Sequence, residues 1–266
     1  MKKKVLAAVL LSGILLPTFA SAADQPGVPT RGSVVFEVVG DTETGTVIVP
    51  GEEDTDDNTI IPEGGGSSTG PLRLESVPDI KFGTIKFKTG KTTHPALLEE
   101  YTKPAEPTVK RAIPHFVQVT DERGLVDGTW KLNVTSTTFK DTAAVAPELI
   151  NSKIILKQQS FFNSVGDFAT PVVAATTLVD GFTGTEATIP TDGTTNVQIL
   201  STKTGQTTNG SKTSTVFNSA YLPENLDSYE VNTYNDGVIL DKANGDNVQI
   251  GVNYESNLIW TLSDSI

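Results

Sequence analysis

The residues best placed for ligand contact are Trp130 and Trp260, the only two tryptophans of the 266-residue chain. Each begins a W-x-L tripeptide, so Leu132 and Leu262 follow two places later. Side chains alternate between the faces of a strand, which places Trp130 on the same face as Leu132, and Trp260 on the same face as Leu262. This alternation favours indoles packed in a core between sheets. The alternative is a pair of partly exposed platforms for sugar stacking or partner binding.

A second segment of interest is Asp121-Glu122-Arg123-Gly124. Asp commonly opens a type I turn and Gly commonly closes one, so the segment predicts a turn. Arg123 also has the planar donor geometry that binds a carboxylate through two hydrogen bonds. Such a carboxylate would come from a bound peptide or from a partner.

Catalytic groups are sparse. The chain has two histidines, His94 and His115, and no cysteine, which excludes a Cys-His pair and makes a His-rich zinc site improbable. Neither histidine lies in a G-x-S-x-G or H-E-x-x-H context. No acidic residue stands out in an apolar strand where burial would raise its pKa. We therefore expect no catalytic residue and no cofactor.

Two charged segments have alternative interpretations. A series of lysines between residues 80 and 98, without an intervening acid, predicts either a solvated face or a patch for an anionic polymer: Lys81, Lys86, Lys88 and Lys91. The acidic series that starts at Asp54 resembles a calcium loop, but Thr59 stands at its sixth place and Gly65 at its twelfth, where such loops need Gly and Glu. We assign it no metal.

The N-terminus predicts export. Residues 1–22 combine a Lys-rich start, an apolar run and an Ala20-Ser21-Ala22 cleavage site, as in a secretory signal peptide. No later segment approaches the roughly 20 apolar residues of a membrane span. An exported chain without cysteine fits Gram-positive secretion. The formal charge is −12 with the three lysines of the signal and −15 without them, which argues against nucleic acid as a partner.

Composition divides the mature chain in two. Residues 23–70 hold one basic residue, Arg31, against ten acidic ones, and predict an N-terminal strand at 33–39 followed by a flexible acidic linker at 40–70. Residues 71–266 predict an all-β, sandwich-like single domain with about ten short strands and long loops. The expected strands are 72–76, 80–88, 113–120, 129–138, 154–159, 172–178, 195–201, 213–218, 234–240 and 248–262. The segments 95–101 and 147–151 are the best candidates for a helical turn.

The ordered set of motifs resembles the WxL-domain surface proteins of Gram-positive bacteria. It comprises Pro71-Leu72-Arg73-Leu74 before Ile80-Lys81-Phe82-Gly83, the segment Val117 to Gly124 before the first W-x-L, and a second W-x-L at the C-terminus. The resemblance covers residues 71–266 and extends to the strand expected at 33–39. It implies a secreted cell-wall protein that binds peptidoglycan or another wall polymer noncovalently, with Trp130, Leu132, Trp260 and Leu262 as its motif residues.

Two other function classes remain open at this point. A protein-interaction subunit would share the fold and dock onto companion surface proteins or host matrix. A secreted polysaccharide hydrolase would instead release reducing sugar from wall or plant glycan.

Overall fold

The computed structural model describes residues 34, 35, 37, 38 and 40–265. The expected signal peptide at 1–22 lies outside the described residues, as do Ser33, Phe36 and Val39 of the expected N-terminal strand. The four described residues between 34 and 38 are not in a strand.

The all-β prediction is confirmed, and every strand pair is antiparallel. What we call the β8 sheet contains β12 (Val179–Gly181), β14 (Val197–Thr202), β8 (Thr129–Ser136) and β18 (Leu258–Ser265), in that order. The β7 sheet contains β11 (Gln159–Asn163), β15 (Ser211–Phe217), β7 (Phe116–Asp121) and β3 (Leu72–Ser76).

Two more four-stranded sheets complete the structure. The β10 sheet contains β13 (Glu186–Pro190), β10 (Lys153–Lys157), β16 (Tyr234–Lys242) and β4 (Thr92–Leu97). The β5 sheet contains β1 (Val47–Ile48), β2 (Thr59–Pro62), β5 (Glu99–Lys103) and β6 (Glu106–Ile113). A two-stranded ribbon pairs β9 (Lys140–Asp141) with β17 (Tyr254–Glu255). The helical pieces are short: α1 (Ala175–Leu178) and the 3-10 turns η1 (Asp56–Asn58), η2 (Gly166–Phe168) and η3 (Pro223–Ser228).

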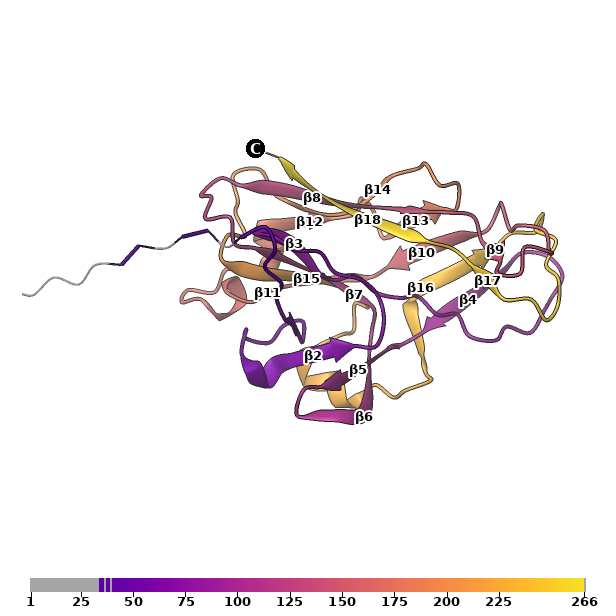
Figure 1. The fold of residues 1–266 in the computed structure, drawn as a ribbon, viewed down its shortest axis with the longest axis horizontal. Helices are drawn as coiled ribbons and strands as arrows, with labels where there is room; N and C mark the ends of the chain where they lie inside the picture. The colour runs from indigo at the N-terminus through magenta and orange to yellow at the C-terminus, as the bar shows by residue number, and fades with distance from the viewer. Residues whose placement is uncertain (1–33, 36, 39, 266) are drawn as a thin grey trace, which may run out of the picture. The chain divides into compact units, whose positions relative to one another are not determined.

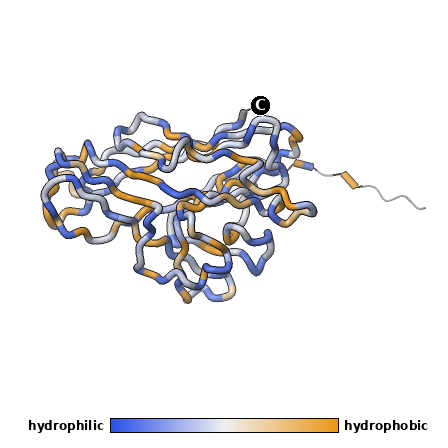
Figure 2. The backbone as a smooth tube through the Cα atoms, turned by 180° about the vertical axis from the view of Figure 1, so that it is seen from behind, coloured by the Kyte–Doolittle hydropathy of each residue, from blue (hydrophilic) through white to orange (hydrophobic). Residues whose placement is uncertain are grey.

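The β7 sheet is the middle layer of the molecule (Figure 1). Every residue of β7 and of β15 is buried, because both faces of this sheet are covered. Val117 and Val119 belong to the main core, which they share with the β8 and β10 sheets. Phe116 and Val216 belong to a second core with residues of the β5 sheet. Short hydrophobic stretches recur along the chain in Figure 2, as expected when successive strands contribute alternate side chains to these layers.

The expectation of a flexible linker at residues 40–70 is wrong. This segment contains β1, η1 and β2, and β2 pairs with β5. Ile48 and Ile60 are each only 2% exposed. The Gln118 amide accepts from the backbone N–H of Ile48 and donates to its carbonyl, both at 3.0 Å. Apolar residues hidden in an acidic segment therefore cover the second face of the β7 sheet.

Three other expectations are wrong. Residues 80–88 form no strand, although Ile80, Phe82 and Ile85 still pack against the main core. The expected strand at 172–178 contains α1 instead. The helical turn expected at 95–101 is strand in β4 and β5, because its backbone pairs with β16 and β6.

Candidate functional site

The two W-x-L tripeptides lie side by side on adjacent antiparallel strands. Strand β18 pairs with β8 so that Leu262 is opposite Leu132, Trp260 is opposite Val134, and Asp264 is opposite Trp130. Directly opposed residues share a face of the sheet, so these residues all project to the side of the main core. The repeated tripeptide is therefore one structural unit built from two distant segments.

Trp130 is a core residue. It is 0% exposed, as are Leu132 and Val134 on the same strand. Its indole Nε1 donates to the Oγ1 of Thr208 at 2.8 Å, and its backbone N–H donates to Thr202 Oγ1 at 2.9 Å. The first of the two interpretations, an indole packed between sheets, describes this residue.

Trp260 has a different environment. It is partly buried and packs against the edge of the main core together with Leu258 and Leu262. Among the described residues, its strand, β18, lies at the end of the β8 sheet and pairs only with β8. On the outer face of β18, Ile259 is 53% exposed.

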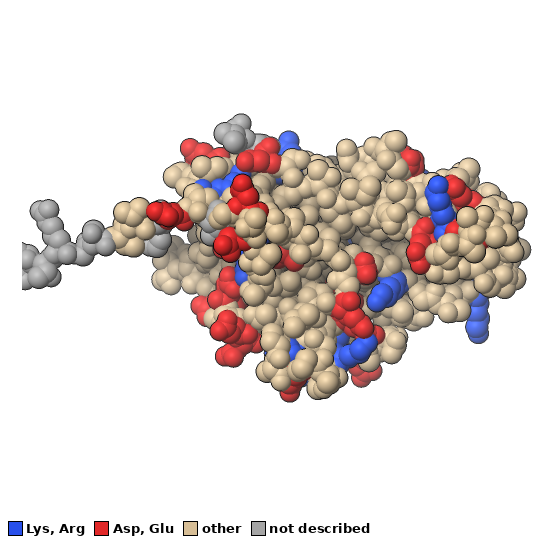
Figure 3. All heavy atoms as spheres, viewed as in Figure 1, with Lys and Arg blue, Asp and Glu red and all other residues tan. Residues whose placement is uncertain are grey.

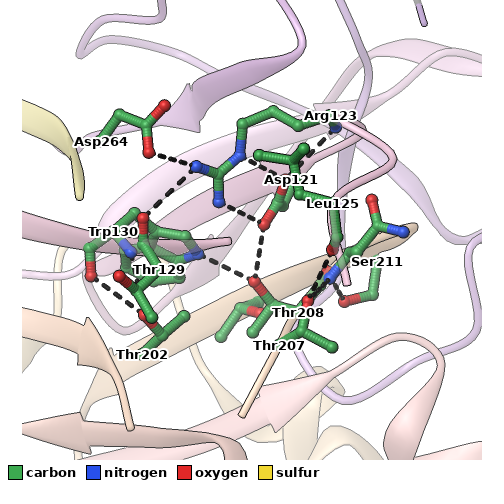
Figure 4. A network of polar contacts seen from close by, with 12 residues as sticks. Asp121, Arg123, Leu125, Thr129, Trp130, Thr202, Thr207, Thr208, Ser211 and Asp264 are labelled. Atoms are coloured by element: carbon green, nitrogen blue, oxygen red, sulfur yellow. Dashed lines mark hydrogen bonds and ion pairs between the residues drawn. The ribbon is translucent and has the colours of Figure 1, made fainter. Parts of the chain in front are cut away.

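Arg123 lies at the centre of a polar network that joins the turn to the tryptophan (Figure 4). It donates from Nε and Nη2 to the two carboxylate oxygens of Asp121 at 2.9 and 2.8 Å, and from Nη1 to Asp264 at 2.5 Å. The Thr208 hydroxyl donates to Asp121 at 3.3 Å and accepts from the Trp130 indole. The hydrogen bonds to Asp121 raise the pKa of the Arg123 guanidinium.

This network assigns a structural role to Asp121 and Arg123. Both are buried, at 1% and 8% exposed, and the Arg123 fork is filled by carboxylates of this chain. The chain bends at Arg123, where Gly124 has a positive φ of 72° and the Asp121 carboxylate accepts the backbone N–H of Arg123 at 3.3 Å. The sequence analysis missed Thr208 and Asp264. An antiparallel pairing that sets Leu262 opposite Leu132 places Asp264, two residues later, opposite Trp130. Assuming this pairing would therefore have identified Asp264 from the sequence.

The charged segments are on the surface. All four lysines of the series at 81–91 are exposed, and Lys91 pairs with Asp241 at 2.9 Å. Acidic side chains gather over the region of η1 and β2, at the lower left of Figure 3. One acid of that region, Asp54, pairs with the buried ammonium of Lys212 at 2.9 Å.

The histidines are separate from one another. His115 is 0% exposed; burial lowers its pKa to about 4, and its Nδ1 lies 3.0 Å from the side-chain nitrogen of Asn235. His94 Nε2 contacts Thr92 Oγ1 at 2.9 Å, and burial lowers its pKa.

One expectation about acids is wrong. Glu99, at the start of β5, is 5% exposed, and burial raises its pKa to about 8. Residue types give no sign of this burial, because Glu99 lies within the stretch Leu97 to Glu100, where a second acid follows it directly and only the packing of β5 decides which of the two is buried.

A shallow groove of about 430 Å³ lies where η3 passes β6. Its walls combine aromatic, basic and acidic side chains: Tyr101, Lys110, Arg111, Asp227, Tyr229 and Glu230. Tyr229 stacks on Tyr221 with ring centroids 6.2 Å apart and remains half-buried. The volume is in the range of small-molecule sites, and the mixture of an aromatic ring with polar groups suits a sugar.

The sequence matches the family described as WxL domain, surface cell wall-binding, over residues 23–265. Because the match spans nearly the whole chain, this protein belongs to the WxL family, a family of wall-binding surface domains rather than of enzymes. It is a protein of the cell wall and cell surface. The match includes residues 40–70, which the sequence analysis had assigned to a linker. No curated protein and no solved structure matches.

No helix in the described residues is both long and apolar enough to cross a membrane.

Proposed function

We propose that this secreted protein attaches noncovalently to peptidoglycan, and that the polymer lies in the groove between β6 and η3. The observation that carries the attachment is the match to the wall-binding family across residues 23–265. Peptidoglycan is a sugar polymer with carboxylate-bearing peptides, so it needs an aromatic platform and cationic donors. In the groove, Tyr229 supplies an aromatic ring. Lys110 and Arg111 supply the cationic N–H donors that their own ion pairs with Glu63, Glu100 and Glu106 leave over.

The tryptophan motif has a supporting role in this proposal. Trp130 and Leu132 are inaccessible, so they act by holding β8 and β18 together. Trp260 and Leu262 complete that edge of the core. The side chains that contact the polymer are therefore solvent-accessible ones outside this motif.

The test is cosedimentation of residues 23–266 with protein-stripped Gram-positive sacculi. We expect wild type to bind, and Tyr229→Ala to bind about tenfold more weakly, the effect of losing roughly 1.4 kcal/mol of contact energy. Phe168→Ala is the matched control, because Phe168 is an exposed aromatic residue, 44% accessible, on η2 outside the groove. Wild type that stays in the supernatant would refute attachment. Equal binding by the two variants would refute the groove as the site of polymer binding.

A second candidate function is docking onto companion surface proteins. It is favoured by the second edge of β18, which no strand within residues 40–265 pairs with, and by the exposed Ile259 on the outer face of β18. Such an edge offers unpaired backbone groups to a strand of another protein. Ile259→Asp should then reduce binding to walls that retain their surface proteins and leave binding to stripped walls unchanged. Binding of this variant equal to that of wild type on walls that retain their surface proteins would contradict docking at β18.

A further inference from the structure

A small cavity of about 30 Å³ lies beside the start of β5, and its lining includes Glu63 and Glu100, the two acidic partners of Lys110. Its polar lining is mainly acidic: Glu63, Asp79, Lys81, Glu99, Glu100 and Asn232. A water needs roughly 10–15 Å³ measured this way, so the cavity has room for one or two groups of that size.

Glu99 is the buried acid of this cavity. Its side chain projects inward from β5, on the same face as the buried Tyr101. Both carboxylate oxygens are inaccessible to solvent, and neither has a hydrogen-bond partner. A buried ionised carboxylate without a partner costs several kcal/mol, so this chain alone does not satisfy Glu99 as an anion.

The charges around Glu99 leave a second carboxylate unneutralised. Lys110 bridges Glu63 and Glu100, at 2.8 and 2.9 Å, and so occupies both. In the part of the chain that the structure describes, Asp79 is exposed and makes no ion pair, and an added Cβ on Gly64 would lie only 2.5 Å from its Oδ2. Glycine at position 64 therefore lets the Asp79 carboxylate approach the backbone at the cavity wall.

The protonation of Glu99 follows from this environment. Burial and the nearby Asp79 carboxylate raise its pKa to about 8, while the exposed Lys81 acts in the opposite direction. At pH 7 the empty cavity therefore holds neutral Glu99. A cation that enters would favour the carboxylate and release its proton.

We propose that this cavity binds a primary ammonium group carried by the wall polymer. An ammonium has three N–H donors and a compact charge, which suit Glu99, Asp79 and the Asn232 amide oxygen in a space of this size. The cavity adjoins the groove through Lys110, so a polymer in the groove can place an amine there. This inference deepens the proposed function and rests on it for the source of the amine.

Binding is tested first with methylammonium chloride as the probe, by calorimetry on residues 23–266 at pH 7. Titration in two buffers of different ionisation heat counts protons, and we expect close to one proton released per bound ion. Tetramethylammonium, which has the charge without N–H donors, should not bind. Methylammonium that gives no heat, or binding without proton release, would overturn the proposal. So would calcium chloride that binds where methylammonium does not.

Variants locate the site. Glu99→Gln should abolish proton release and weaken methylammonium binding at least tenfold. Asp79→Asn should weaken binding while proton release per bound ion persists, and it covers the case in which Glu99→Gln does not fold. Glu53→Gln, which removes an exposed acid outside the cavity, is the control and should bind like wild type. Unchanged binding by folded Glu99→Gln and Asp79→Asn would exclude this cavity.

Acetylated sacculi separate this inference from the proposed function. Acetic anhydride converts wall amines to amides, so wild type should bind treated walls at least tenfold more weakly than untreated walls, and Glu99→Gln should bind both alike. Equal binding of wild type to both walls would refute the ammonium site and leave attachment intact. Absence of binding to either wall would refute attachment, and the methylammonium titration would still decide the cavity.

Discussion

Replacing Thr208 by Val tests whether the indole of Trp130 depends on its buried hydrogen bond. Thr208 is 2% exposed, and its hydroxyl accepts from Trp130 Nε1 at 2.8 Å. Valine keeps the shape and removes the acceptor, which leaves a buried N–H unsatisfied at a cost of about 1–3 kcal/mol. For a chain of this size each kcal/mol lowers Tm by roughly 2–4 °C.

The assay is urea unfolding followed by far-UV circular dichroism, with a double-mutant cycle that includes Trp130→Phe. The phenylalanine side chain has no N–H that could be left without an acceptor. Thr208→Val should therefore lower the free energy of unfolding by about 1–3 kcal/mol less in the Trp130→Phe background than in wild type. The loss of the 3.3 Å contact from Thr208 to Asp121 occurs in both backgrounds and cancels.

Thr207→Val is the control, because Thr207 is half-buried and its hydroxyl makes hydrogen bonds at the surface, donating to the Leu125 carbonyl at 3.3 Å and accepting from the Asn209 N–H at 3.1 Å. It should change stability by less than about 0.5 kcal/mol. If Thr208→Val costs the same in both backgrounds, the indole N–H is not the source of the effect and the reasoning fails.

Three further predictions concern buried polar groups. The pKa of Glu99 is raised from 4.5 to about 8, so the contribution of neutral Glu99 to stability is complete below pH 4.5 and is lost as the pH rises through 8, by up to about 5 kcal/mol. Urea unfolding at pH 5 and 9 should show this loss in wild type and not in Glu99→Gln. The same change in stability between the two pH values in both proteins would contradict this prediction. Asp121→Asn should destabilise the protein by about 3–5 kcal/mol, since it breaks a buried ion pair with Arg123. Asp264→Asn should destabilise it less, because the Asp264 side chain is 39% exposed. The reverse order of Tm values in thermal melts would contradict these roles of the two carboxylates. Gln118→Leu removes both hydrogen bonds to Ile48, so limited proteolysis should cut residues 40–62 faster than in wild type, and an unchanged cleavage pattern would show that these bonds do not hold the segment.

Much of the local structure was predictable from residue types. Alternation in the segment around Trp130 places Trp130, Leu132 and Val134 on one face, and all three are buried. The strand expected at 72–76 has the same bounds as β3. Gly124 follows the bend at Arg123 with a positive φ that favours glycine. These features depend on a few consecutive residues, which is the range that a sequence pattern describes.

Long-range features required the tertiary structure. The composition of residues 40–70 predicts a solvated linker, because the acids outnumber the few apolar residues, yet Ile48 and Ile60 are buried once β7 and β5 supply partners. The position of Glu99 likewise becomes buried only when β5 packs inward.

The sequence alone determined that the chain is an all-β member of a wall-binding family, since periodicity and an ordered set of motifs are local properties. Only the tertiary structure decided that the two W-x-L tripeptides are neighbours, that the N–H donors of Arg123 bind the carboxylates of Asp121 and Asp264, and that Trp130 is inaccessible to solvent. The physical reason is that strand pairing and desolvation depend on residues far apart in the chain. Arg123 and Asp264, for example, are 141 positions apart and meet because β18 adds to β8.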